Sequence, residues 1–211
     1  MTRGLLILAL LFVGGAAQAH PHAWIDLRVS LLFGADGRLE ALQQQWAFDP
    51  TYSLLLLEDV AARHPDIELD AALQLMTERM LANLREYDYF TEIALGTQRL
   101  EVEDARNAAL ALRASRLHIQ FEIPLEPARP DPTRPLRYAV YDPSYWIEVL
   151  HDPDDVIHLD GGHDCMAEIA RPRPEPWLIT YAGTLNREQR APIEDLGRSF
   201  AEVVSIECAA R

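Results

Sequence analysis

An alternation of apolar and polar side chains over residues 22–33 constrains the fold of this chain more than any other feature. Its apolar members are Ala23, Ile25, Leu27, Val29, Leu31 and Phe33. Side chains of a β-strand point to opposite faces in turn, so this period of two predicts a strand with one buried face. Asp36 and Gly37 follow it and predict a two-residue hairpin turn. The facing pairs of that hairpin are expected to be Leu31 with Leu42, Leu27 with Trp46, and Ile25 with Phe48.

Two helices are expected after the hairpin. Asp49 suits an N-cap and Pro50 the first helical position, so a helix is expected to run from there to Arg63. A second helix is expected over residues 66–87, where apolar side chains recur at steps of three and four. Strands are expected at 89–103, 107–125, 136–141, 145–150, 156–159 and 166–170, and a short helix feeding a terminal strand within 193–208. The sequence thus predicts an α+β fold with a largely antiparallel sheet and two central helices.

The first 19 residues have the composition of a secretory signal peptide. Arg3 precedes an apolar run over residues 5–13, and Ala17, Gln18 and Ala19 end it with small side chains. The run is too short to remain as a membrane-spanning helix, so no stable membrane anchor is expected after cleavage. The mature chain, residues 20–211, then forms either a single exported domain or two lobes joined near the five prolines of residues 124–135.

Charge and cysteine content narrow the function further. The net charge of −14 disfavours nucleic acid as a partner and concentrates cations around the protein. Cys165 and Cys208 are the two cysteines, and an even pair in an exported chain predicts a disulfide, with two thiolate metal ligands as the alternative. No nucleophile elbow, zinc-protease helix or phosphate loop occurs, and no enzymatic activity is expected.

Cleavage after Ala19 would expose a histidine as the first residue. The α-amine and the imidazole of His20 can chelate one metal ion, and the imidazole of His22 can complete a T-shaped set of three nitrogen ligands, a geometry typical of copper(II). Pro21 has no amide hydrogen, so a square-planar site made from deprotonated amides cannot form there. Asp26 follows on the same strand face but lies too far along it to share the ion, and a supporting or ion-pairing role is expected. The alternative is a polar strand start that binds nothing.

A second histidine cluster occurs in an acidic stretch near residue 155. His151, His158 and His163 lie within it, and Asp160 is placed to support a ligand. Three imidazoles with one further position form an ordinary zinc site, although this spacing matches no named motif. The alternative is a solvated acidic turn whose histidines lie at the surface.

Several segments resemble one bacterial family. They are His20-Pro-His22-Ala-Trp-Ile-Asp26, Asp36-Gly37, Trp46-x-Phe48-Asp49-x-x-Tyr52-Ser53, Tyr87-x-Tyr89-Phe90-Thr91, Tyr141-Asp142-Pro143-Ser144-Tyr145 and the two cysteines. The chain resembles domain-of-unknown-function family 1007, periplasmic proteins labelled as a component of an uncharacterised ABC-type transport system. The resemblance implies a periplasmic location and an association with nickel, cobalt or zinc transport, but it supplies no catalytic residues.

These observations together predict a periplasmic accessory protein that binds a divalent transition metal (zinc, nickel, cobalt or copper). It is expected to buffer the metal or deliver it to a membrane transporter. One alternative is an interaction subunit of a transport system that binds no metal. Another is a redox enzyme built on the N-terminal histidines, although the sequence offers no matching substrate surface.

Overall fold

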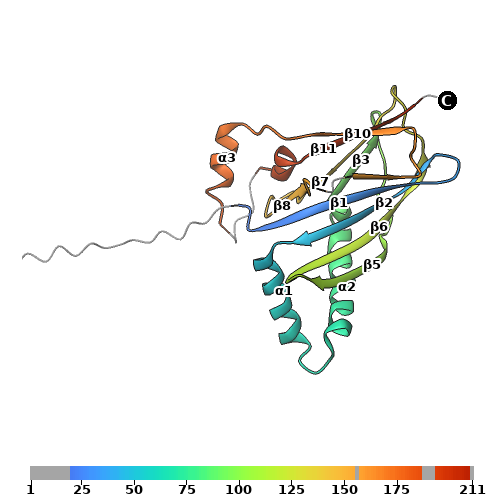
Figure 1. The fold of residues 1–211 in the computed structure, drawn as a ribbon. Coiled ribbons are helices and arrows are strands. Elements are labelled where there is room, and N and C mark those ends of the chain that lie inside the picture. Colours follow the sequence, from blue (N-terminus) through green and yellow to red (C-terminus); the bar gives the residue numbers. More distant parts are fainter. Residues whose placement is uncertain (1–19, 155–156, 187–192, 210–211) are drawn as a thin grey trace, which may run out of the picture.

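The computed structural model describes residues 20–154, 157–186 and 193–209, which form two β-sheets with three α-helices (Figure 1). The predicted signal peptide lies outside the described residues. The first sheet has the order β5-β6-β2-β1-β8, and β9 also pairs with β1. Its strands are β1 (Ala23–Phe33), β2 (Leu39–Phe48), β5 (Arg106–Arg113), β6 (Arg116–Ala128), β8 (Ile147–His151) and β9 (Ile157–Asp160). The strands β8 and β9 run parallel to β1, and the other pairs are antiparallel.

The second sheet is wholly antiparallel and has the order β10-β11-β7-β3-β4. Its strands are β3 (Thr91–Leu95), β4 (Gln98–Arg99), β7 (Leu136–Val140), β10 (Cys165–Ala170) and β11 (Val203–Cys208). Cys165 and Cys208 face each other across β10 and β11 and form a disulfide, as the sequence predicted. The cross-link fixes the last strand to the strand beside it.

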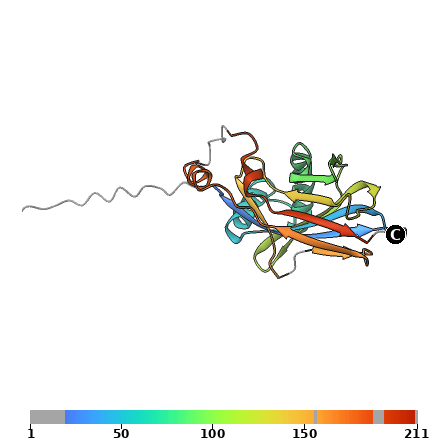
Figure 2. The ribbon, with the colours of Figure 1, turned by 90° about the horizontal axis from the view of Figure 1, so that it is seen from above.

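The helices cover different parts of the molecule. The helices α1 (Pro50–Arg63) and α2 (Leu69–Arg85) lie side by side below the first sheet in Figure 1, where α1 contacts β6 and α2 contacts β5. The short helix α3 (Pro176–Ala182) lies at the end of the molecule opposite to the end of β11 in both views (Figures 1 and 2). Two 3₁₀ turns, η1 (Asp88–Phe90) and η2 (Leu196–Phe200), precede β3 and β11. Among the described residues, no helix has both the length and the apolar character needed to cross a membrane.

The first hairpin has the predicted register from Ile25 to Leu32, but the pairing shifts at Phe33, and three residues instead of the predicted two lie between the hydrogen-bonded Gly34 and Arg38. The observed pairs include Leu31 with Leu42, Leu27 with Trp46, and Ile25 with Phe48. All six of these side chains are at most 2% exposed, and they belong to one core cluster that also takes in Ile93, Tyr138 and Val204 of the second sheet. Asp49 caps α1, because its carboxylate accepts the backbone N–H of Tyr52, and Pro50 is the first helical residue. The main α+β prediction is confirmed.

Further details of the secondary structure differ from the prediction. Residues 89–103, predicted as one strand, hold the end of η1 and the two short strands β3 and β4. Residues 107–125 include a tight turn between β5 and β6, where Ala114 and Ser115 both have positive φ although neither is a glycine or an asparagine. The first part of the predicted loop at 124–135 is strand, because β6 continues to Ala128 as a partner of β2. Helix α3 was not predicted, since its seven residues are too few to show a helical period.

Candidate functional site

The histidines at the start of β1 form a close pair. The ring centroids of His20 and His22 are 4.8 Å apart, and the two ring planes are inclined by 74°. Nδ1 of His20 and Nε2 of His22 are both buried, and neither has a hydrogen-bond partner. Buried nitrogens of this kind are uncommon, because leaving a buried polar atom unpaired costs about 1–3 kcal/mol. Two such atoms on adjacent rings mark this place as the strongest candidate site among the described residues.

Three segments that are distant in the sequence hold the pair in place. The backbone N–H of His22 donates to the carbonyl of Trp146 at 2.8 Å, just before β1 and β8 begin their parallel pairing. The ring of His22 packs against the indole of Trp146, with centroids 5.4 Å apart. The indole in turn packs on Tyr52 of α1. On the other side, the backbone N–H of His20 donates to the carbonyl of Ala182 at the end of α3 at 3.3 Å.

A rigid loop before β8 carries the indole that supports His22. The carboxylate of Asp142 is buried and accepts the backbone N–H groups of Ser144 and Ile147 as well as the Ser144 hydroxyl. Tyr145 has a positive φ of 58° within this loop, and its ring stacks on Phe200 of η2. The loop is therefore fixed by its own hydrogen bonds and by packing in a second, smaller core cluster, which consists of Tyr145, Leu178, Ala182, Leu185, Leu196 and Phe200.

The surroundings keep the first imidazole in its neutral form. Burial lowers the pKa of His20 below its usual value, and the neighbouring His22 lowers it further, while Asp142 and the carbonyl of Leu185 oppose the change. Imidazole binds metal ions through a neutral nitrogen, so a lowered pKa leaves this ligand available at neutral pH.

The separation of the rings fits a shared ion. With metal–nitrogen bonds of about 2.0–2.1 Å, two imidazoles on one ion have centroids roughly 4.5–5 Å apart in adjacent positions and roughly 6.4 Å apart in opposite positions. The observed 4.8 Å corresponds to adjacent positions. A T-shaped set with the two rings opposite each other would need the rings of His20 and His22 to move apart by about 1.6 Å.

His151 belongs to a different environment. It lies at the end of β8 and is 8% exposed. Its Nδ1 is 2.9 Å from Oε2 of Glu202, and its Nε2 is 3.1 Å from the hydroxyl of Tyr138. The same Glu202 oxygen accepts the backbone N–H of His151 at 2.8 Å. Both ring nitrogens are thus engaged within the core, where the imidazole connects β8 with β7 and with the residue before β11.

The other residues of the predicted second cluster are dispersed. His158 is exposed on β9 beside Ser30, His163 is exposed in the turn before β10, and Asp160 is exposed at the end of β9. No group of three or more His, Cys, Asp or Glu side chains that could hold a metal ion occurs in residues 20–154, 157–186 and 193–209. The structure therefore does not bring His151, His158 and His163 together. The carboxylate of Asp26 forms an ion pair with Arg116 at 2.7 Å, as one reading of the sequence predicted.

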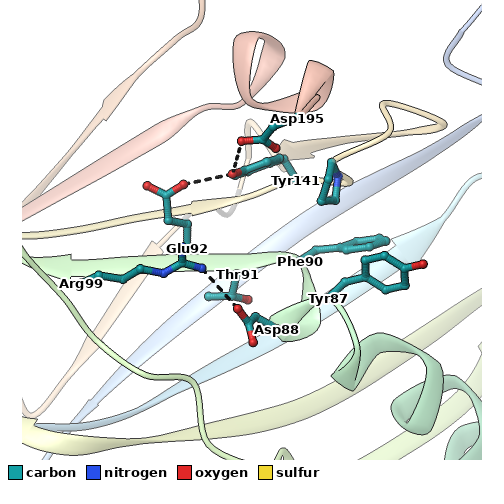
Figure 3. Close-up of a pocket in the computed structure, with 9 residues that line it drawn as sticks. Tyr87, Asp88, Phe90, Thr91, Glu92, Arg99, Tyr141 and Asp195 are labelled. Atoms are coloured by element: carbon teal, nitrogen blue, oxygen red, sulfur yellow. Dashed lines mark hydrogen bonds and ion pairs between the residues drawn. The ribbon is translucent and has the colours of Figure 1, made fainter. Parts of the chain in front are cut away.

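A polar cavity of about 230 Å³ lies beside η1, on the edge of the second sheet (Figure 3). Its charged side chains are paired with one another: Arg99 with Asp88, Arg198 with Glu92, and the Tyr141 hydroxyl with Glu92 and Asp195. Burial raises the pKa of Tyr141 well above its usual value, with Glu92 adding to the effect, so the phenol remains a proton donor. These pairings satisfy the charges that line the cavity, and it is a weaker candidate than the histidine pair.

The floor of this cavity has unusual backbone geometry. Asp88, Tyr89 and Phe90 all have φ between 50° and 58°, a left-handed turn that costs about 1–2 kcal/mol per residue. Packing holds it in place, because Phe90 stacks on Trp46 and the buried Tyr89 hydroxyl accepts the backbone N–H of Ala105. Sequence reasoning missed this turn and Trp146, and it named Asp142, Tyr89 and Phe90 only as parts of segments shared with a family, without a structural role for them.

Comparison with known proteins assigns a family but no activity. A family model described as "Protein of unknown function (DUF1007)" matches residues 5–208. An uncharacterized protein of Haemophilus influenzae is 20% identical over 202 residues, which cover 94% of this chain and 95% of that relative. An "Uncharacterized 15.5 kDa protein in trpE 3'region" of Spirochaeta aurantia is 32% identical over 104 residues, which cover 48% of this chain and 71% of that relative. No solved structure matches the chain.

Proposed function

This chain belongs to the DUF1007 family, whose description names no activity, and from the geometry of its own histidines we propose that it binds a divalent transition metal. The ligands are the imidazoles of His20 and His22. Two buried ring nitrogens without partners, on rings 4.8 Å apart, are the observation that carries this role. Imidazole nitrogen suits zinc, nickel, cobalt and copper ions, and a bound ion would satisfy both nitrogens at once.

The proposed role is that of a periplasmic accessory protein. It would be exported by the N-terminal leader, and it would buffer the metal or deliver it to a membrane transporter of the ABC type. The disulfide supports an oxidising compartment, and the net charge of −14 would raise the local concentration of cations. We propose binding without catalysis, because the sequence has no nucleophile elbow, zinc-protease helix or phosphate loop.

Metal titration of the exported protein tests this function. The protein is produced with its own leader and purified from the periplasm, and its first residue is determined by mass spectrometry. Calorimetric titration with Zn²⁺, Ni²⁺, Co²⁺ and Cu²⁺ is expected to show one site for at least one of these ions. His22→Ala is expected to weaken that binding by about 100-fold, because it removes a direct ligand.

The matched control is His163→Ala, which removes an exposed imidazole away from the pair. This variant is expected to bind as the unaltered protein does. If the exported protein binds none of the four ions, the metal function is overturned, and a subunit that only contacts other proteins of a transport system becomes the better account. Equal weakening by both substitutions would also overturn the assignment of the site.

A further inference from the structure

We infer that the α-amine of His20, released by cleavage before this residue, is the third ligand of the site, and that the resulting three-nitrogen set selects copper(II). This inference rests on the proposed function and goes beyond it by naming the ion and a ligand that the uncleaved chain lacks. It predicts that the protein acquires its full metal affinity only after the leader has been removed.

A third ligand has to come from outside the side chains. Among the described residues, no third His, Cys, Asp or Glu side chain lies close enough to His20 and His22 to complete a metal site with them. Asp142 is close enough to influence the charge of His20, but its carboxylate already accepts hydrogen bonds from Ser144 and Ile147. The backbone nitrogen of His20 is therefore the nearest candidate, since it is part of the same residue as one of the ligands.

The identity of the unpartnered atoms matches this arrangement. Nδ1 is the ring nitrogen nearer to the backbone, so an α-amine and the Nδ1 of the same residue can close a six-membered ring around a metal ion, whereas Nε2 points too far away. Nδ1 is the nitrogen of His20 that has no partner. The ring of His20 donates its hydrogen bond to the backbone carbonyl of Leu185 instead. His22, two residues further along the chain, leaves its outer ring nitrogen, Nε2, without a partner, and this nitrogen is free to bind the same ion.

The backbone nitrogen is also held in a position that tolerates the new bond. Its N–H donates to the carbonyl of Ala182 at 3.3 Å. An amine has two hydrogens once it is bound to a metal, so it can keep this hydrogen bond while its lone pair faces the ion. Tyr181, the residue before Ala182, has a buried hydroxyl without a partner, which is the third such atom among the described residues. The three buried polar atoms without partners thus lie on residues 20–22 and on α3, and these two segments are joined by the hydrogen bond from His20 to Ala182.

Three nitrogen donors favour copper(II) over the other candidates. Affinity for such ligands rises along the first-row divalent ions to a maximum at Cu²⁺ and falls again at Zn²⁺. Zinc can also use three protein ligands with water in the fourth position, but it prefers to arrange them toward the corners of a tetrahedron. Copper(II) prefers a square plane, and an amine with two imidazoles in adjacent positions fills three of its corners.

The composition of the chain provides a selective test. All 19 basic residues are arginines, so after cleavage the α-amine is the only primary amine in the protein. Acetylation of the exported protein at near-neutral pH therefore blocks this group alone and removes its ability to bind metal. Copper(II) affinity is measured by competition with a chromophoric chelator before and after acetylation, with circular dichroism to verify that the fold is retained. The nitrogen couplings in the copper EPR spectrum count the ligands.

The untreated protein is expected to bind Cu²⁺ at least about 100-fold more tightly than Zn²⁺, and acetylation is expected to weaken Cu²⁺ binding by at least about 100-fold. The EPR spectrum is expected to change from three coupled nitrogens to two. Bound Cu²⁺ should also protect the amine from acetylation. Tyr181→Phe serves as the control variant, because it removes no nitrogen ligand and should retain the effect of acetylation.

The outcomes separate this inference from the proposed function. If acetylation leaves the Cu²⁺ affinity unchanged while His22→Ala abolishes it, the amine is not a ligand, and metal binding by the imidazoles stands. If Zn²⁺ binds as tightly as Cu²⁺, the selection of copper is overturned and the proposed function remains. A mature chain that does not begin at His20 overturns the inference. Absence of binding by the untreated protein overturns both.

Discussion

Replacing Glu202 with alanine is expected to lower the free energy of unfolding by about 3–5 kcal/mol at neutral pH. The carboxylate is 7% exposed, and one of its oxygens receives the backbone N–H of His151 at 2.8 Å and lies 2.9 Å from the ring Nδ1. The substitution leaves both groups of His151 buried without a partner. Each unsatisfied group costs about 1–3 kcal/mol, and the tyrosine on the far side of the ring cannot replace the carboxylate.

The loss should depend on pH in a defined direction. Burial alone raises the pKa of Glu202, but the hydrogen bonds from the ring and the backbone of His151, together with the charges of His151 and Arg171, outweigh it, and the pKa lies below its usual value. A carboxyl group whose pKa is lower in the folded state stabilises the fold above its unfolded pKa. That stabilisation disappears as the pH falls through the folded value. The difference between the two proteins is therefore expected to be present near neutral pH and to shrink as the pH falls below about 5.

Urea unfolding with the disulfide intact measures this difference, at neutral pH and at several acidic values. The expected change is a lower midpoint with an unchanged slope. Glu168→Ala is the control, because it removes an exposed carboxylate on β10 and should alter the stability by less than about 0.5 kcal/mol. A loss below about 1 kcal/mol for Glu202→Ala, or a loss that does not change with pH, would refute this account of the buried cluster.

Two further substitutions test the cross-link and the loop beside the histidines. Changing Cys165 and Cys208 together to serine is expected to cost about 3–4 kcal/mol in urea unfolding, since the bond closes a loop with a sequence separation of 43; an unaltered midpoint would contradict this. Gly197→Ala would place a Cβ 1.9 Å from the backbone oxygen of Asp142, so a loss of about 1–3 kcal/mol and weaker metal binding are expected. Gly183→Ala, whose Cβ would meet its neighbours at no less than 3.4 Å, should leave both measurements nearly unchanged.

Local chemistry was sufficient to predict the framework on which the site is built. The alternation along β1 and the Asp-Gly turn predicted the register of the first hairpin, because a shift by one residue would have moved every apolar side chain to the wrong face. Asp49 and Pro50 likewise predicted where α1 begins, because an N-cap and a first-turn proline are local signals. The proximity of His20 and His22 also follows from their spacing, although the sequence did not indicate that their free nitrogens would be buried.

Residues that act across long distances in the chain escaped this reasoning. Histidine is a common metal ligand, but the ring of His151 contacts Glu202 and Tyr138, and no local sequence pattern connects these residues with it. The left-handed turn at Asp88–Phe90 has no glycine, and only the packing of Phe90 on Trp46 and the buried Tyr89 hold its backbone there.

The sequence by itself determined the strands with one apolar face, the capped first helix, the cysteine pair and the two N-terminal histidines, because each depends on residues that are close together or on composition. The tertiary structure decided which of the histidines keep unpartnered nitrogens. Parallel pairing of β1 with β8 places Trp146 beside His22, and α3 places Ala182 beside His20. Burial and hydrogen bonding depend on contacts between segments more than 100 residues apart, and those contacts exist only once the chain has folded.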